Sequence, residues 1–332
     1  MRFAVVGAGS VGCYIGARLQ VCGHTVVYIG RRPIADAVAT HGLEVSDYRG
    51  WSATVDRDDC WFTEEMALAA TADAVFVTVK SGATRDVAAL LGRGLSRHTS
   101  VISLQNGIRN AAQLARECHG VAAGTVGFTV ARVGPTHFRQ ASKGGLTIGP
   151  AATDVAAALT AAGLPTATRR EMLPLQWGKL LLHLNNAVNG LSGLTLGDQL
   201  AQRDFRRVYA AAVAEGLGVL RIAGQPVASP LAIPLAAVPR ILRAPDSLFA
   251  RAAQQFVPMD PTACSSMADD LAADKPTEVD YLNGEIVAMA ARLGTTAPVN
   301  AALVKLVHDT ERTRRRPWSA DALLAAVGAT AQ

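Results

Sequence analysis

Three glycines near the N-terminus limit the fold of this chain more than any other feature. Gly7, Gly9 and Gly12 have the spacing G-x-G-x-x-G and directly follow the apolar run at 3–6. Such a run is typical of a buried parallel strand, and the residues from Ser10 onward have a helical pattern. In strand–turn–helix units of this kind, the first glycine allows a tight turn, the second lets the backbone approach a pyrophosphate, and the third permits close helix packing. The phosphate-binding residues that we expect are Gly7, Ala8, Gly9, Ser10, Val11 and Gly12.

The end of the second predicted strand indicates which dinucleotide would bind. The strand at 25–29 leads into Arg31 and Arg32, and the next acidic residue is Asp36. A carboxylate at this point suits a ribose 2′-hydroxyl, whereas a guanidinium binds a 2′-phosphate through charge-assisted hydrogen bonds. We therefore predict NADPH as the cofactor. The alternative is that both arginines are ordinary solvated loop charges.

The order of the predicted elements indicates two domains. A chain of 332 residues exceeds what one hydrophobic core usually holds. Strand and helix patterns alternate up to about residue 170, which predicts an α/β fold with a doubly wound parallel sheet of the Rossmann type. After that point only helical periodicity remains. We expect an NADPH-binding domain at 1–170 and an all-helical substrate and catalytic domain at 171–332.

The predicted elements have the following bounds. Strands are expected at 2–6, 25–29, 74–79, 100–105 and 123–128, and a hairpin at 132–149. Helices of the second domain are expected at 171–192, 201–224, 246–256, 276–293, 298–312 and 319–330.

Composition excludes several classes of protein. The five cysteines are scattered without a C-x-x-C pair, and the histidines lack ligand spacing, so we expect reduced thiols and no metal. A net charge of +5 without an aromatic-studded basic stripe fits small anionic molecules better than nucleic acid. No apolar run reaches the roughly 18 to 20 residues that span a bilayer. We expect a cytoplasmic protein with no membrane partner, interpret the basic run at 312–316 as a solvated helix end, and leave a homodimer open.

One predicted helix carries a polar stripe on an otherwise apolar surface. Lys179, His183 and Asn186 share a face of the helix at 171–192, whose leucines point in every direction. A lysine is rarely fully buried unless it is paired, so this stripe indicates either a cleft lining or a lysine that reaches solvent. Glu278, in the first turn of the helix at 276–293, is the natural partner for Lys179, and the alternative is an ordinary acid at a helix start.

Two further polar residues follow apolar strands. Asn106 comes after the run VISL, and Lys80 ends the run AVFVTV. Both are expected at the carboxyl edge of the sheet, where Asn106 would lie near the nicotinamide and Lys80 could reach the cofactor. Ordinary turn chemistry is the alternative for both.

Along nearly its whole length the chain resembles the ketopantoate reductase (2-dehydropantoate 2-reductase) family. The segments that carry the resemblance are GAGSVGCYIGARL, the GRR after the second strand, VFVTVKS, SLQNGI, QWGKLLL, CSSMADDL and KPTEVDYLNG. The resemblance implies a Rossmann domain and a helical domain with NADPH and ketopantoate between them, and a place in pantothenate and coenzyme A biosynthesis.

The resemblance also implies roles for particular residues. Lys179 would be the proton donor, and Glu278 would contact the cofactor side and organise the site. Asn106 would lie by the nicotinamide and the substrate, and Ser266 would hold the substrate, a small anionic 2-oxo acid. Arg31 and Lys80 would bind the phosphate-bearing half of NADPH. Asn106 and Glu278 are therefore implied for both the cofactor and the catalytic site.

Two positions and one segment depart from the family pattern. His183 stands where the family has an asparagine that contacts the substrate, so Asn186 could take over that contact. Ala83 replaces a glutamine that often contacts the cofactor, and the segment THFRQASKGG is atypical. If His183 faces the substrate, its protonated form should strengthen binding of an anionic 2-oxo acid at low pH.

Three other functions compete with ketopantoate reduction. One is reduction of a different 2-oxo acid or ketone on the same scaffold, with His183 marking an altered pocket. Another is a β-hydroxyacid or 6-phosphogluconate-type dehydrogenase, against which Ser265, Ser266 and the PTEVDYLNG segment argue. A third is a non-catalytic NADPH-binding sensor, which would not need Lys179 and Glu278 together.

Overall fold

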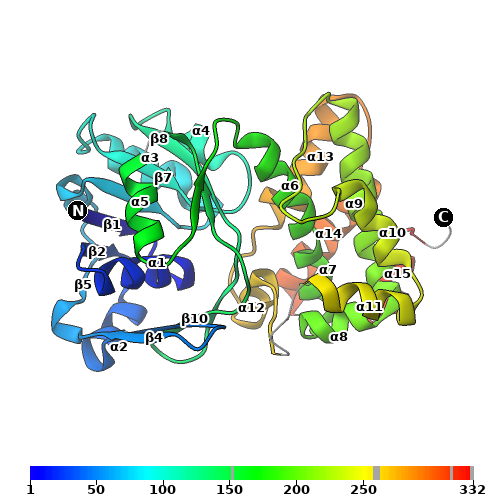
Figure 1. Cartoon of the computed structure of the whole chain (residues 1–332). Helices are drawn as coiled ribbons and strands as arrows, with labels where there is room; N and C mark the ends of the chain where they lie inside the picture. Colours follow the sequence, from blue (N-terminus) through cyan, green and yellow to red (C-terminus); the bar gives the residue numbers. More distant parts are fainter. Residues whose placement is uncertain (151–152, 257–261, 315–316, 330–332) are drawn as a thin grey trace. The chain divides into compact units, whose positions relative to one another are not determined.

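Two sheets and a set of helices make up the chain, seen in a computed structural model that describes residues 1–150, 153–256, 262–314 and 317–329 (Figure 1). Its contacts divide it into two units, Met1–Met172 and Leu173–Gln332. All strands of the described residues belong to the first unit, and the described part of the second is helical. The predicted fold class is confirmed.

The larger sheet of the first unit has eight strands. All neighbouring pairs are parallel except β8 with β11. The strands in spatial order are β12 (Thr166–Thr168), β11 (Leu146–Ile148), β8 (Val121–Val126), β7 (Ser100–Ser103), β6 (Ala74–Val77), β1 (Arg2–Val6), β2 (Thr25–Ile29) and β5 (Trp61–Thr63).

Both faces of this sheet are covered, which explains why its strands are apolar throughout rather than alternating. On β1, Phe3 and Val5 join one hydrophobic cluster, and Ala4 and Val6 join another. The first cluster includes residues of α1 (Ser10–Val21) and α5 (Thr153–Ala161), and the second includes residues of α3 (Thr84–Gly92) and α4 (Asn110–Leu114). The remaining helices of the unit are α2 (Arg32–His41), η1 (Arg57–Asp59), η2 (Met66–Thr71) and η3 (Ser81–Ala83).

A second, four-stranded sheet packs on the same side as α1. Its order is β4 (Ser52–Val55), β3 (Leu43–Asp47), β10 (His137–Gln140) and β9 (Val130–Arg132). The predicted hairpin at 132–149 is wrong, because β10 pairs with β9 and β3, whereas β11 returns to the larger sheet beside β8. Helix α1 contacts strands of both sheets, so residues 12–19 of α1 are all buried.

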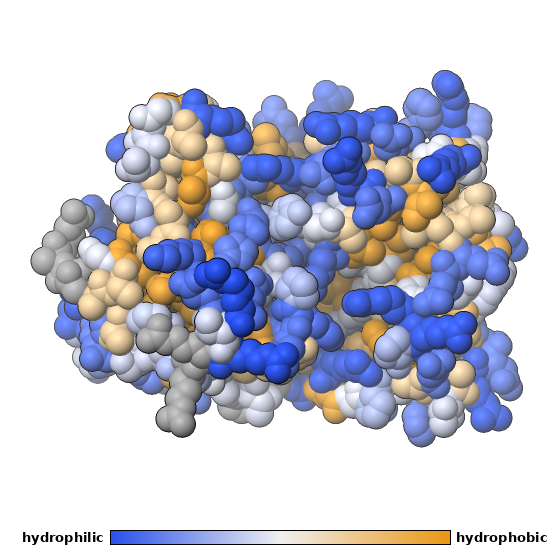
Figure 2. Space-filling model, turned by 180° about the vertical axis from the view of Figure 1, so that it is seen from behind, coloured by the Kyte–Doolittle hydropathy of each residue, from blue (hydrophilic) through white to orange (hydrophobic). Residues whose placement is uncertain are grey.

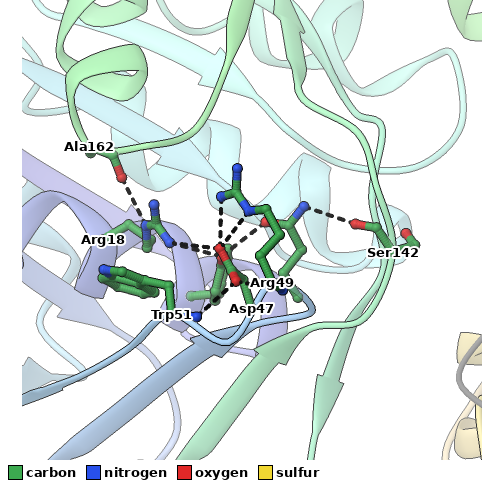
Figure 3. Close-up of polar contacts among 8 residues, drawn as sticks. Arg18, Asp47, Arg49, Trp51, Ser142 and Ala162 are labelled. Carbon is green, nitrogen blue, oxygen red and sulfur yellow. Dashed lines mark hydrogen bonds and ion pairs between the residues drawn. The ribbon is translucent and has the colours of Figure 1, made fainter.

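One of the buried residues of α1 is an arginine, Arg18, which contacts a cluster of polar groups (Figure 3). Arg18 donates from Nε to the carbonyl of Ala162 at 2.8 Å, and its guanidinium lies 3.7 Å from the centre of the Trp51 ring. It also lies 3.7 Å from the carboxylate of Asp47, which Arg49 contacts at 2.7 Å. Burial raises the pKa of Asp47, but hydrogen bonds from Arg49 and Trp51 outweigh it and leave the pKa below its usual value. The cluster therefore ties the C-terminal half of α1 to the smaller sheet and to the loop after α5.

The second unit contains ten α-helices among its described residues, arranged around α9. Helix α9 contacts α6, α7, α8, α10, α13, α14 and α15. The helices are α6 (Leu173–His183), α7 (Asn185–Ser192), α8 (Leu196–Ala201), α9 (Arg203–Ile222), α10 (Val238–Arg243), α11 (Asp246–Phe256), α12 (Ser266–Ala272), α13 (Asn283–Arg292), α14 (Pro298–Thr313) and α15 (Ala320–Ala326), with two short turns at η5 (Leu235–Ala237) and η6 (Val279–Tyr281).

Two of the predicted helices are interrupted. The helix expected at 171–192 breaks at Leu184 into α6 and α7, and the Tyr209 hydroxyl donates to the Leu182 carbonyl at 3.0 Å. In a continuous helix that carbonyl would accept from the amide of Asn186, so Tyr209 occupies the acceptor at the break. The helix expected at 276–293 begins only at Asn283, and Glu278 instead precedes the short turn η6.

The surface is largely hydrophilic on the face drawn in Figure 2, with apolar side chains interspersed. Among the described residues, none of the helices has the length and apolar character needed to cross a membrane. In the basic run at 312–316, Arg312 pairs with Asp309 and Arg314 with Asp274. Arg315 and Arg316 lie outside the described residues.

Candidate active site

Four neighbouring parallel strands bring their carboxyl ends to one edge of the larger sheet. These are β7, β6, β1 and β2, and they are followed by the segments that contain Asn106, Lys80, Gly9 and Arg31 respectively. In open α/β sheets, ligands bind beyond the carboxyl ends of the strands where the winding reverses, and here β1 is the strand from which the chain proceeds in both directions. The first unit thus gathers four of the predicted site segments.

The three glycines of the turn after β1 differ in what surrounds them. Gly7 has a φ of +102°, and a Cβ there would lie 2.5 Å from the amide nitrogen of Val79. A Cβ at Gly12 would lie 2.6 Å from the carbonyl oxygen of Gly7. At Gly9 the only neighbour within 4 Å from the described part of the chain, adjacent residues aside, would be the Gly7 oxygen, at 4.0 Å. The fold therefore requires Gly7 and Gly12, whereas Gly9 leaves an open cradle that a Cβ would fill.

Backbone donors face this cradle from the start of α1. The first intrahelical bond runs from the amide of Cys13 to the carbonyl of Gly9, at 2.8 Å. The amides of Ser10, Val11 and Gly12 precede it and have no helical acceptor, which is the arrangement that binds phosphate groups. Thr78, which the sequence did not single out, fixes the turn, because its hydroxyl donates to the Gly7 carbonyl at 2.7 Å.

The end of β2 presents two arginines in different surroundings. Arg31 precedes α2 and is exposed, and its side chain has no hydrogen-bond or ion-pair partner among the described residues. Arg32 lies 3.6 Å from the carboxylate of Glu64, and both side chains are exposed. The nearby acid arrives from β5, whose Thr63 carbonyl accepts from the Gly30 amide. In the sequence the next acid after Arg32 is Asp36, and the sequence alone does not show that β5 pairs with β2 and brings Glu64 beside Arg32.

A buried polar network holds the Asn106 loop. The carbonyl of Asn106 accepts from Asn110 Nδ2 at 2.6 Å and from the Ser81 hydroxyl at 3.1 Å. Asn110 in turn accepts from the Thr84 hydroxyl at 2.8 Å, and Thr84 accepts from Gln105 Nε2 at 2.7 Å. Asn110, Thr84, Gln105 and Ser81 are all buried, so the loop after β7 is fastened to the start of α3.

In the second unit, Lys179 of α6 and Glu278 lie close enough to interact electrostatically. Burial lowers the pKa of Lys179 to about 8, while the Glu278 carboxylate acts in the opposite direction. The preceding Gly178 lets the Ala228 carbonyl approach α6 at a place where a Cβ would collide with it. An ammonium with a pKa this close to neutrality can release a proton readily, which is what general acid catalysis requires.

His183 lies one turn after Lys179 and is neutral. Burial, together with the charge of Lys179, lowers the pKa of His183 to about 3. This pKa argues against the expectation that a protonated His183 strengthens anion binding between pH 5 and 8, because the loss of solvent and the neighbouring ammonium both disfavour a second positive charge.

The start of α12 is fastened to α7. The Ser265 amide donates to Asn189 Oδ1 at 2.8 Å, and its hydroxyl contacts the Asn186 carbonyl at 3.4 Å. Ser265 also accepts from the Ala268 amide, so it is the N-cap of α12, and Ser266 is the exposed first residue of the helix. The structure thus brings Asn186 and Ser266 into one neighbourhood, through Ser265 and Asn189, which the sequence did not single out.

Within residues 1–150, 153–256, 262–314 and 317–329, no group of three or more His, Cys, Asp or Glu side chains is placed to hold a metal ion. All five cysteines are free, and burial raises the pKa of Cys13 and Cys60 above that of an ordinary thiol.

Comparisons with known proteins agree over both units. The family model for Ketopantoate reductase PanE/ApbA matches residues 3–153, and that for Ketopantoate reductase PanE/ApbA C terminal matches residues 171–311. The 2-dehydropantoate 2-reductase of Halobacterium salinarum is 30% identical over 323 residues, covering 94% of this chain and 99% of that protein. The enzyme of the same name from Mycobacterium tuberculosis H37Rv is 28% identical, covering 92% and 96%.

Solved structures extend the likeness to three dimensions. A PanE/ApbA family ketopantoate reductase from Ralstonia eutropha has a TM-score of 0.80 and 30% identity, covering 95% of this chain and all of that one. A ternary structure of D-mandelate dehydrogenase with NADH and anilino(oxo)acetate has a TM-score of 0.77, covering 94% and 99%, and its 18% identity shows a shared fold.

Proposed function

The chain belongs to the ketopantoate reductase family, and from this premise we propose that it reduces the C2 carbonyl of ketopantoate to the hydroxyl of pantoate with NADPH and with Lys179 as proton donor. It is an oxidoreductase of the nicotinamide-dependent type. We assign NADPH to the unit Met1–Met172, and substrate binding and proton transfer to Leu173–Gln332. The observation that carries the proposal is the Lys179–Glu278 pair, with its ammonium pKa near 8.

The residues after β1 fit a dinucleotide. The open cradle at Gly9 and the amides of Ser10, Val11 and Gly12 would hold its pyrophosphate. Arg31, exposed and without a partner among the described residues, would receive the 2′-phosphate that distinguishes NADPH from NADH, and Lys80 would support the same half of the molecule. When bound, the nicotinamide supplies the hydride.

Lys179 would stabilise the negative charge that develops on the substrate. As the carbonyl carbon gains a hydride, its oxygen becomes negative, and an ammonium aimed at it stabilises that charge and then transfers a proton from Nζ. Burial brings the pKa of Lys179 towards a useful value, while Glu278 retains the proton and holds the ammonium in place. Both side chains belong to the second unit, so the pair does not depend on the first.

Four polar groups remain for the rest of the substrate. Asn106 is the group that we assign near the nicotinamide, on the loop held by Ser81 and Asn110. We assign Asn186 and Ser266 to the substrate, at the junction of α7 and α12. His183 adds one neutral donor, because an imidazole with a pKa of about 3 keeps a single ring N–H at physiological pH.

Steady-state oxidation of NADPH with a panel of 2-oxo acids tests the proposal. Ketopantoate should give the highest kcat/KM, and NADH should support much slower turnover. The panel should include 2-oxo acids with bulky aromatic substituents, since D-mandelate dehydrogenase shares the fold. If one of these is preferred over ketopantoate, the chain is a reductase of a different 2-oxo acid and His183 marks the altered pocket. If NADPH binds and no acid is turned over, a non-catalytic sensor replaces the enzyme.

A further inference from the structure

His308 and Glu311 of α14 contact the residues on either side of Glu278. Glu278 lies between Thr277 and the turn η6, and its carbonyl accepts from the Tyr281 amide at 3.0 Å. The Thr277 amide donates to Glu311 Oε1 at 2.8 Å. On the other side of Glu278, Asp280 Oδ1 lies 3.0 Å from His308 Nε2. Both flanks of Glu278 are thus bound to α14.

His308 and Glu311 complete the link between these two contacts. His308 Nδ1 lies 2.9 Å from Glu311 Oε2, while the other oxygen of Glu311 holds Thr277. The imidazole therefore faces one carboxylate with each nitrogen. A neutral ring has one donor and one acceptor, so only the imidazolium can donate to both carboxylates at once. The contacts with Glu311 and Asp280 outweigh the effect of burial and raise the pKa of His308, which favours this doubly donating form.

Packing alone does not secure the segment. A cavity of about 540 Å³ borders it, and the walls include Lys275, Pro276, Thr310 and Glu311. Residues 272–276 are exposed. Val279, directly after Glu278, is buried and anchors one side of the segment by packing, whereas on the exposed side the polar contacts to α14 hold it.

The other acids near His308 are already engaged. On α14 itself, Arg312 pairs with Asp309, and in the loop after α12 Asp274 pairs with Arg314. The acids of the helices that pack on α14 are also occupied: Glu215 of α9 accepts from the amides of 299 and 300, and Glu285 of α13 pairs with Arg292. Helix α7 carries no ionisable side chain. Asp280 and Glu311 are therefore the charges that govern His308.

We propose that His308 is a positioning residue, whose imidazolium joins Asp280 to Glu311 and thereby fixes the Glu278 carboxylate beside Lys179. The inference rests on the proposed function only for its consequence in catalysis. The distance between the Lys179 ammonium and the Glu278 carboxylate affects the pKa of Lys179, which can be measured without any turnover of substrate. Loss of the link lets Glu278 move away from Lys179, and the ammonium then loses a stabilising charge.

The test is an NMR titration of Lys179, with lysine labelled at Cε and the resonance assigned by Lys179→Arg. The chain has only five lysines, so the spectrum is simple. His308→Asn should lower the midpoint of Lys179 by roughly half a pKa unit, about a threefold change in its deprotonated fraction. Asp280→Asn, a milder change at an exposed side chain, should lower it in the same way. His119→Asn, at an exposed histidine of the first unit, is the matched control and should leave it unchanged.

Glu278→Gln supplies the decisive comparison. It should lower the midpoint by itself, and adding His308→Asn to it should have no further effect, because the histidine acts through Glu278. An unchanged midpoint in His308→Asn, in a protein where Glu278→Gln does lower it, would overturn the proposal and reduce the contacts to surface ion pairs. An unchanged midpoint in Glu278→Gln would overturn it as well. A lowered midpoint in a protein that reduces no 2-oxo acid would retain the positioning role and reject the proposed function.

Discussion

Lys179 and His183 lie one turn apart on α6, and burial together with the Lys179 ammonium lowers the pKa of His183. With a pKa of about 3, the imidazole stays neutral from pH 5 to 8, so it cannot act there as a switch for anion binding. We expect KM for the 2-oxo acid to show the same pH dependence in wild type and in His183→Asn. Initial rates across that range measure it. A KM that rises near pH 6.5 in wild type alone would contradict a neutral His183.

The same lowered pKa predicts sensitivity to acid. An unfolded histidine titrates near 6.5, so between pH 3 and 6.5 the unfolded chain binds a proton that native His183 refuses. Stability therefore falls as the pH decreases through this window. His183→Asn should lose less of its melting temperature between pH 7 and pH 5 than wild type does, with His119→Asn as the control. If the melting temperatures of wild type and His183→Asn fell in parallel with pH, the His183 imidazole would be exposed to solvent.

Removal of the proton donor should affect turnover far more than cofactor binding. We expect Lys179→Ala to lower kcat by roughly 10²–10⁴-fold with nearly unchanged affinity for NADPH. Because the donor must be protonated, the wild-type rate should fall as the pH rises through about 8. Lys179→Arg is the informative companion, since a guanidinium keeps its proton and should remove the alkaline fall in the residual activity. Near-normal turnover in Lys179→Ala would refute the assignment.

Gly9 and Gly12 should respond differently to the same methyl group. Apart from its immediate chain neighbours, a Cβ at Gly9 would meet no atom of the described residues closer than 4.0 Å, so Gly9→Ala should fold with unchanged stability and lose cofactor affinity. At Gly12 it would lie 2.6 Å from the Gly7 oxygen, and overpacking of this kind costs about 1–3 kcal/mol. Thermal unfolding and calorimetric titration with NADPH separate the two effects. Full NADPH affinity in Gly9→Ala would mean that the cradle does not hold the pyrophosphate.

Arg31 should distinguish the two nicotinamide dinucleotides. Loss of a charged hydrogen bond costs about 1.5–3 kcal/mol, so Arg31→Ala should weaken NADPH by about 10- to 150-fold. Affinity for NADH should hardly change. Arg32→Ala is the matched control, because Arg32 already pairs with Glu64 and should matter less. Fluorescence titrations with both cofactors decide it, and an equal loss for the two would remove Arg31 from the 2′-phosphate.

Sequence reasoning succeeded where the signal is local and stopped where the structure depends on distant pairing. The strand, glycine turn and helix at the N-terminus are adjacent in the chain, so their spacing specifies them. The smaller sheet was missed because its strands are only three to five residues long, and its two local pairs, β3 with β4 and β9 with β10, are joined by the pairing of β3 with β10 across about 90 residues. The contact between Glu64 and Arg32 likewise depends on β5 pairing beside β2.

The candidate site shows the same limit. Lys179 and Glu278 could be paired from their motifs, but His308 lies 30 residues beyond Glu278 on a helix whose pattern looks ordinary. The low pKa of His183 could not be foreseen either, because it depends on how much solvent the fold removes from the ring. The break at Leu184 is accompanied by a contact from the Tyr209 hydroxyl of α9, and the residues of α6 and α7 alone do not predict it.

The buried Arg18 gives the glycine turn a firm foundation. Since Arg18 fixes the C-terminal half of α1 and Thr78 fixes the glycine turn before it, the amides that point into the cradle are held in place before a ligand arrives. Ordering of a binding loop usually subtracts from affinity, and here folding has already completed it. The adenine-nucleotide half of a cofactor would therefore meet a receptor of fixed shape. Selection between related dinucleotides at this unit then depends on side chains at its rim, such as Arg31, which can change without disturbing the turn beneath them.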